Sequence, residues 1–278
     1  MKLCYNMQSG NVSTFKIKGI LHKTEEFMKK AILFMMSLLF TFGCTGCSPK
    51  DEDTSSSTDA TASSNDASTS SKDETKLPLS GKTFVFLGSS IVAGYSGYSM
   101  CEYLTENYGC EIVKIAKAST WLVDREGYND SYVQRFNNML PYIEDCNHFV
   151  CQLSTNGAGS LVIGEVSMSY DPADFDTTTL IGAIEYITAT ARETWKCPVS
   201  FFSCVNKQSQ GYTRCVEALY EVQEKWDIGI LDLYNDEEFN NISEEQRAVY
   251  LREDGVHPTH KGYEEWYTPK FAEYLLKY

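Results

Sequence analysis

Five short apolar runs constrain the fold of this chain more than any other feature of its sequence. Each run has the length of a strand and little alternation of polar and apolar residues. They are TFVFL (83–87), EIVKIA (111–116), HFVCQL (148–153), VSFFS (199–203) and IGILDL (228–233). Nearly continuous apolar character indicates strands that are buried on both faces, as in parallel sheets.

Segments with helical periodicity lie between or after these runs. The clearest covers residues 179–196, where apolar side chains recur every three or four positions, and residues 213–226 and 262–276 have a similar pattern. Alternation of strands and helices predicts an α/β domain, a three-layer α/β/α sandwich around a five-stranded, mainly parallel sheet. In such domains the functional residues lie at the carboxyl ends of the strands.

The N-terminal part has the composition of an export signal. Residues 28–47, MKKAILFMMSLLFTFGCTGC, contain two lysines, an apolar run too short to span a bilayer comfortably, and then small residues with cysteine. We therefore expect translation to start at Met28, with residues 1–27 as an upstream extension. The end of the signal resembles a bacterial lipobox, and Cys47, which follows Thr45 and Gly46, fits the lipidated position better than Cys44. A lipid anchor at Cys47 would hold the protein outside the cell membrane without crossing it.

Residues 48–76 are rich in Ser, Thr and Asp and contain no aromatic residue and no aliphatic residue larger than alanine. Such a segment cannot bury enough apolar surface to offset chain entropy, so we predict a disordered tether. Residues 77–278 then form one domain, which is large enough for its own core.

Charge and cysteine content exclude several classes of function. The chain carries a net charge of −14, all of it contributed by residues 77–278, which disfavours nucleic-acid binding. Seven cysteines follow Cys47 at scattered spacings, so they define no disulfide framework. These seven cysteines form no CxxC pair and the histidines lack the paired spacing of zinc ligands, so no metal site is expected.

Polar residues follow the first three apolar runs, and one late loop adds others. The segments are FLGSSIVAG (86–94), AKASTWLVD (116–124), STNGA (154–158) and DGVHPTH (254–260). The adjacent serines of the first segment fit a nucleophile raised on a tight turn, an anion-binding loop or an ordinary strand-to-helix connection. The glycine spacing does not match the dinucleotide pattern and no Walker lysine follows, which disfavours a phosphate loop.

These segments resemble the conserved blocks of the SGNH hydrolases, also called the GDSL esterase/lipase family. The resemblance implies a flavodoxin-like SGNH fold, with Ser90 as nucleophile and His257 and Asp254 completing a triad. It also implies an oxyanion hole formed by Ser90, Ser119 and Asn156. The sequence departs from the family pattern at four positions: Ser89 replaces the commonest aspartate, Ser119 and Ser154 replace glycines, and Gly157 replaces an aspartate.

The chemistry of the residues agrees with this assignment. A serine hydroxyl needs a neighbouring base to become a nucleophile. His257 lies three residues after Asp254, with Gly255 and Pro258 on either side of it in the same loop. That carboxylate can orient the imidazole, although Asp-Gly and His-Pro are also common in surface turns. His148 begins an apolar strand and is interpreted as a buried structural residue, and His260 as a surface residue.

The sequence therefore predicts an extracytoplasmic serine esterase that hydrolyses O-acetyl or other short acyl esters through an acyl-enzyme on Ser90. No cofactor or metal is expected. The expected partner is an ester substrate, with an acylated polysaccharide as the leading candidate, and the membrane is contacted through the N-terminal lipid anchor alone. The alternative is a non-catalytic cell-surface protein that binds glycans on an SGNH scaffold.

Overall fold

The computed structural model describes residues 76–278. The predicted upstream extension, signal peptide and Cys47 lie outside these residues, as does all of the predicted tether except Lys76, so those predictions stand as made.

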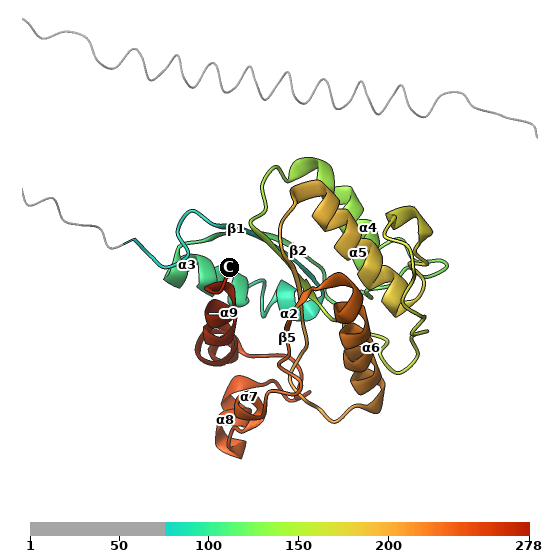
Figure 1. Cartoon of the computed structure of the whole chain (residues 1–278). Helices are drawn as coiled ribbons and strands as arrows, with labels where there is room; N and C mark the ends of the chain where they lie inside the picture. Colours follow the sequence, from blue (N-terminus) through green and yellow to red (C-terminus); the bar gives the residue numbers. More distant parts are fainter. Residues whose placement is uncertain (1–75) are drawn as a thin grey trace, which may run out of the picture. The chain divides into compact units, whose positions relative to one another are not determined.

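A single five-stranded sheet forms the centre of the domain (Figure 1). Its strands are β1 (Thr83–Gly88), β2 (Glu111–Ala116), β3 (His148–Gln152), β4 (Val199–Phe202) and β5 (Gly229–Leu231). All neighbours pair in parallel in the order β2-β1-β3-β4-β5. The predicted α/β fold is confirmed, and the sheet is entirely rather than mainly parallel. The connection after β1 leads to β2 on one side of it, and the connection after β2 leads to β3 on the other side. A topological switch point therefore lies at the carboxyl ends of β1 and β3.

Helices cover both faces of this sheet (Figure 1). Two longer helices lie on one face and three on the other. The first pair is α3 (Met100–Tyr108) and α9 (Thr268–Leu275), and the second set is α4 (Tyr132–Met139), α5 (Leu180–Trp195) and α6 (Gln210–Trp226). Shorter elements are α2 (Ser90–Ala93), α7 (Glu237–Asn240), α8 (Glu244–Tyr250), a π-helical turn (Gly262–Tyr267) and 3-10 turns at Leu140–Tyr142 and Pro172–Asp174.

Side-chain caps explain where the predicted helices begin. Thr179 accepts a hydrogen bond from the Gly182 amide and starts α5, as the periodicity indicates. Ser209 accepts from the Tyr212 amide, so α6 begins three residues before the predicted segment. The segment predicted at 262–276 divides into the π-helical turn and α9.

The core is formed by the strands and the inner faces of the helices. Side chains such as Phe86, Phe149 and Phe201 are fully buried, and each contributes about 2–3 kcal/mol relative to an exposed position. All seven cysteines of the domain are buried and unpaired.

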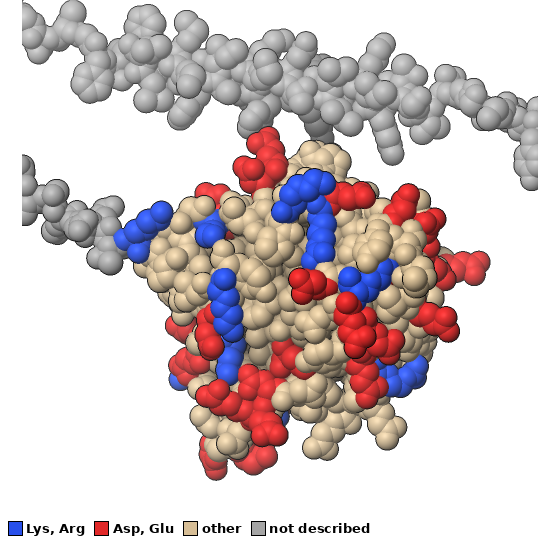
Figure 2. Space-filling view, viewed as in Figure 1, with Lys and Arg blue, Asp and Glu red and all other residues tan. Residues whose placement is uncertain are grey.

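Acidic side chains gather over α6 and the α7–α8 region in the face shown in Figure 2. Of the helices in residues 76–278, none combines the length and the apolar character needed to cross a membrane.

Candidate active site

Ser90 lies at the first position of α2, immediately after β1 ends. The side-chain Oε1 of Gln152, at the end of β3, accepts hydrogen bonds from the amides of Ser89 (2.9 Å) and Val92 (3.4 Å) and so holds the turn. A Cβ atom on Gly88 would lie 2.3 Å from Val92 Cγ2. A glycine at this position therefore allows the chain to turn sharply enough to raise the Ser90 hydroxyl at the edge of the sheet.

His257 lies in a loop that is stabilised by hydrogen bonds among the residues of the loop. The Asp254 Oδ1 atom accepts from the amides of Val256 and His257, both at 2.9 Å, and the Arg252 amide donates to the His257 carbonyl at 2.8 Å. After the loop, the buried Tyr263 hydroxyl donates to the carbonyl of Ile91 in α2 at 2.9 Å. This bond joins the segment that follows His257 to the helix that carries Ser90.

The structure brings Ser90, His257 and Asp254 into one chain of hydrogen bonds. His257 Nε2 lies 2.7 Å from Ser90 Oγ, and His257 Nδ1 lies 2.9 Å from Asp254 Oδ2. With Asp254 ionised, Nδ1 donates to the carboxylate, which leaves Nε2 free to accept the serine proton. This is the geometry that nucleophilic catalysis by serine requires.

Local hydrogen bonding keeps Asp254 charged. Partial burial alone would raise its pKa, but the amides of His257 and Val256 and the His257 ring outweigh that effect and lower the pKa to about 2. The carboxylate is therefore ionised throughout the neutral range. There it orients the imidazole and stabilises the imidazolium that forms when the serine proton is transferred.

The two other sequence-predicted residues, Ser119 and Asn156, line the same cavity as Ser90 and His257, which has a volume of about 250 Å³. Ser119 has φ +63°, the left-handed conformation that a glycine adopts without strain. The Asn156 side-chain amide donates to the Thr120 carbonyl at 3.0 Å. Because an amide has two N–H groups, this bond fixes the group and leaves one donor for a ligand. The arrangement provides three candidate oxyanion donors, including the Ser90 amide.

The departure at Gly157 has a structural explanation. Gly157 has φ +74°, and a Cβ atom there would lie 2.5 Å from the indole ring of Trp121. An aspartate at this position would collide with that ring. The space that an aspartate side chain would need is therefore occupied by Trp121, from the loop after β2.

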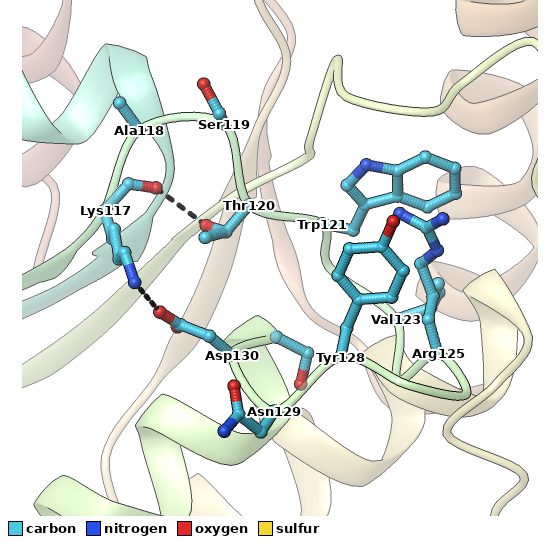
Figure 3. A pocket seen from close by; sticks show the side chains of 11 residues that line it. Lys117, Ala118, Ser119, Thr120, Trp121, Val123, Arg125, Tyr128, Asn129 and Asp130 are labelled. Carbon is cyan, nitrogen blue, oxygen red and sulfur yellow. Dashed lines mark hydrogen bonds and ion pairs between the residues drawn. The ribbon is translucent and has the colours of Figure 1, made fainter.

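A second cavity, of about 360 Å³, adjoins the first (Figure 3). The two cavities share Ala118 and Ser119 in their walls. In the second, the Arg125 guanidinium carbon lies 3.7 Å from the Trp121 ring centre and 4.1 Å from that of Tyr128. The loop that carries the candidate oxyanion donor Ser119 thus separates two hollows of comparable size.

The remaining histidines of the domain lie apart from the triad. His148 is fully buried at the start of β3 and its Nε2 lies 2.7 Å from Ser200 Oγ, which agrees with the structural interpretation. His260 is exposed, with its ring 4.9 Å from that of Tyr95.

Sequence reasoning did not identify the supporting residues Gln152 and Tyr263, since a buried amide and a helical tyrosine carry no local signal of function. Within residues 76–278, no cluster of three candidate metal ligands occurs.

Comparisons with known proteins identify the fold. No protein-family model matches the chain, and no curated protein matches it in sequence. A solved structure from Lactobacillus plantarum is similar with a TM-score of 0.57 and 20% identity, covering 72% of this chain and 99% of its own. A protein described as a GDSL-like lipase from Bacteroides uniformis gives a TM-score of 0.52 at 12% identity and covers 71% of this chain and 96% of its own. Another GDSL-like lipase, from Bacteroides ovatus, gives 0.50 at 14% identity, covering 71% and 99%.

Proposed function

We propose that the protein is a serine esterase that acts outside the cytoplasm on short acyl esters. The proposal proceeds from the fold of the domain, which is that of the SGNH or GDSL hydrolases. The observation that carries this proposal is the continuous Ser90–His257–Asp254 hydrogen-bond chain. Ser90 and His257 both line the cavity although they are distant in sequence, and Asp254 supports His257 from the same loop.

The reaction follows from the positions of the hydrogen-bonding atoms. Ser90 Oγ attacks the ester carbonyl carbon while His257 Nε2 accepts its proton. The resulting oxyanion accepts hydrogen bonds from the Ser90 and Ser119 amides and the Asn156 side chain. His257 then donates its proton to the alkoxy oxygen, the carbon–oxygen bond breaks and an alcohol leaves an acyl-Ser90 ester. Water, deprotonated by His257, cleaves this ester and regenerates the serine with release of the carboxylic acid.

The departures from the family blocks are compatible with this chemistry. A backbone N–H serves as an oxyanion donor whatever its side chain, and Ser119 keeps the positive φ of a glycine. Trp121 occupies the space next to Gly157, and Ser154 Oγ accepts a hydrogen bond from the backbone N–H of Asn156 at 3.1 Å. These contacts favour a catalytic protein over a scaffold that only binds ligands.

The substrate that we propose is an O-acetyl or other short acyl ester on a carbohydrate. The cavity next to Ser90 is small, and the Tyr95 side chain in its wall is 41% exposed. Exposed aromatic faces near a catalytic serine suit the apolar faces of sugar rings. A lipid anchor at Cys47 followed by a tether would place this site close to surface polysaccharides.

Hydrolysis of p-nitrophenyl acetate tests the proposal. The wild-type domain should turn this ester over, and the Ser90→Ala variant should lose at least about 10³-fold in kcat while unfolding at the same temperature. The variant Ser96→Ala, in an exposed turn, is the matched control. Absence of turnover in the wild type, together with glycan binding that persists in Ser90→Ala, would instead favour the non-catalytic glycan-binding alternative.

A further inference from the structure

One arginine side chain lines the cavity of the candidate nucleophile, and a second lines the adjoining cavity. Arg252 lines the cavity that contains Ser90 and His257, and its guanidinium carbon lies 5.4 Å from the centre of the Tyr95 ring. Arg125 lines the adjoining cavity, where it is packed between Trp121 and Tyr128 (Figure 3). Among the ion pairs formed within residues 76–278, none includes either arginine.

The other charges in the walls of these cavities do not neutralise the two arginines. The single carboxylate in either wall is Asp130, which already contacts Lys117 and Arg135. Because Lys117 is paired with Asp130, Arg125 and Arg252 are the two charges of the walls without a carboxylate partner, and the walls carry net positive charge. The chain as a whole carries −14, and acidic groups gather around α6 and α7–α8 in the face shown in Figure 2. The walls of the two cavities therefore differ in sign from the net charge of the chain.

The two cavities form a connected surface on both sides of the loop that carries Ser119. Ala118 and Ser119 belong to both walls, so a ligand that reaches Ser90 from one side can extend over this loop to the other. On each side a guanidinium group is associated with an aromatic ring. This packing holds its N–H groups in place without consuming them, and a planar guanidinium can bind a carboxylate or a phosphate through two hydrogen bonds.

The aromatic rings add a second kind of recognition. Tyr128 is 62% exposed and Tyr95 41% exposed, so part of each side chain is accessible beside the cationic group that packs on it. A ligand that combines rings with negative charge would use both features. A neutral acyl ester would leave the guanidinium groups solvated and gain nothing from them.

We infer that the ester substrate is an anionic glycan, whose carboxylate or phosphate groups bind Arg252 and Arg125 on the two sides of the loop that carries Ser119. This inference rests on the proposed esterase function and specifies its substrate class. Ser90 attacks an O-acetyl group as described above, and the arginines position the sugar without taking part in proton transfer.

Matched sugar esters test the inference directly. The probes are mono-O-acetylated methyl glucosides that differ only at C6, where they carry a hydroxymethyl group, a carboxylate or a phosphate ester. We expect kcat/KM for acetate release to be about tenfold higher for at least one anionic probe than for the neutral one, the effect of one charge-assisted hydrogen bond. The ratio between the two anionic probes shows whether carboxylate or phosphate is preferred. Added salt should reduce the preference because the groups are partly exposed.

Arginine variants show where the preference arises. Arg252→Gln and Arg125→Gln should each reduce the ratio of anionic to neutral kcat/KM towards one, measured within each variant. The control Arg192→Gln removes a charge from the end of α5 just before β4, near the amino-terminal ends of the parallel strands and away from the site at their carboxyl ends. It should leave both the ratio and the basal activity unchanged.

Equal kcat/KM for all three probes would overturn the inference, as would hydrolysis of p-nitrophenyl acetate without release of acetate from any sugar probe. Either result would leave the esterase proposal standing. If the wild-type domain hydrolyses none of the sugar probes and no p-nitrophenyl acetate, the proposed function itself fails.

Discussion

His257 Nε2 lies 2.7 Å from Ser90 Oγ, although 167 residues separate them in the chain. Strand β1 ends two residues before Ser90. The hydrogen bond between the Tyr263 hydroxyl and the Ile91 carbonyl holds the segment that follows His257 against α2. The contact is therefore a product of the fold, and each supporting residue can be tested separately.

Replacing Asp254 by asparagine should reduce kcat strongly with little loss of stability. The asparagine oxygen can still accept from the Val256 and His257 amides, but its NH2 group would face His257 Nδ1 and favour the wrong tautomer. We expect a loss of about 10³–10⁴-fold in kcat for p-nitrophenyl acetate at neutral pH. Glu253→Gln, an exposed neighbour, is the control. Similar rates in the two variants would show that Asp254 does not orient the base.

Asn156→Ala should lower kcat by about 10²–10³-fold with a smaller effect on KM, because the amide is expected to bind the oxyanion more strongly than the ester carbonyl. The exposed Asn138 of α4 provides the control variant Asn138→Ala. Steady-state kinetics distinguish the two effects. A change in KM alone would mean that Asn156 binds the ground state and transition state equally.

Ser119→Gly should stabilise the domain while keeping its activity. Relief of the left-handed conformation gains about 1–2 kcal/mol, and the flexibility of glycine in the unfolded chain costs about 0.5–1 kcal/mol. The expected net gain is about 0.5–1 kcal/mol in urea unfolding, with unchanged esterase rates because the backbone amide remains. Ser96→Gly, at another positive φ, should give a similar gain. A large loss of activity in Ser119→Gly would show that the hydroxyl participates.

The stability of the domain should fall in acid because of His148. Burial lowers the pKa of this histidine to about 4, so the unfolded chain binds its proton more readily than the folded one. Stability from this group is complete above the unfolded pKa of about 6.5 and is lost as the pH falls from there to about 4, by about 3 kcal/mol in total. The measurement is the free energy of unfolding against pH for wild type and His148→Gln, with His260→Gln as control. An equal slope in wild type and His148→Gln over this range would contradict the assignment.

Much of the fold could be predicted because buried parallel strands have a direct sequence signature. The run at 111–116 matches β2 residue for residue. The run at 228–233 contains β5 but extends beyond it, because Asp232 accepts hydrogen bonds from the Tyr234 and Asn235 amides and begins a turn there. Helices α3 and α4 were not predicted. Both start with a serine capping box, and both are short amphipathic segments in which polar residues interrupt the apolar pattern.

The candidate site was predictable in its principal residues and not in its surroundings. Ser90, His257 and Asp254 stand in segments whose residue types and spacing indicate chemistry. The contact between Trp121 and Gly157 and the approach of Arg252 to the cavity depend on loops that meet only in three dimensions. No local pattern encodes such contacts.

Reaction with a fluorophosphonate probe, followed by peptide mass spectrometry, tests the central claim most directly, because only an activated serine reacts with it. We predict a single adduct on Ser90 in the wild-type domain, absent in Ser90→Ala and strongly reduced in His257→Gln. A wild-type domain that is folded yet unlabelled, or that is labelled at another residue, would contradict the account.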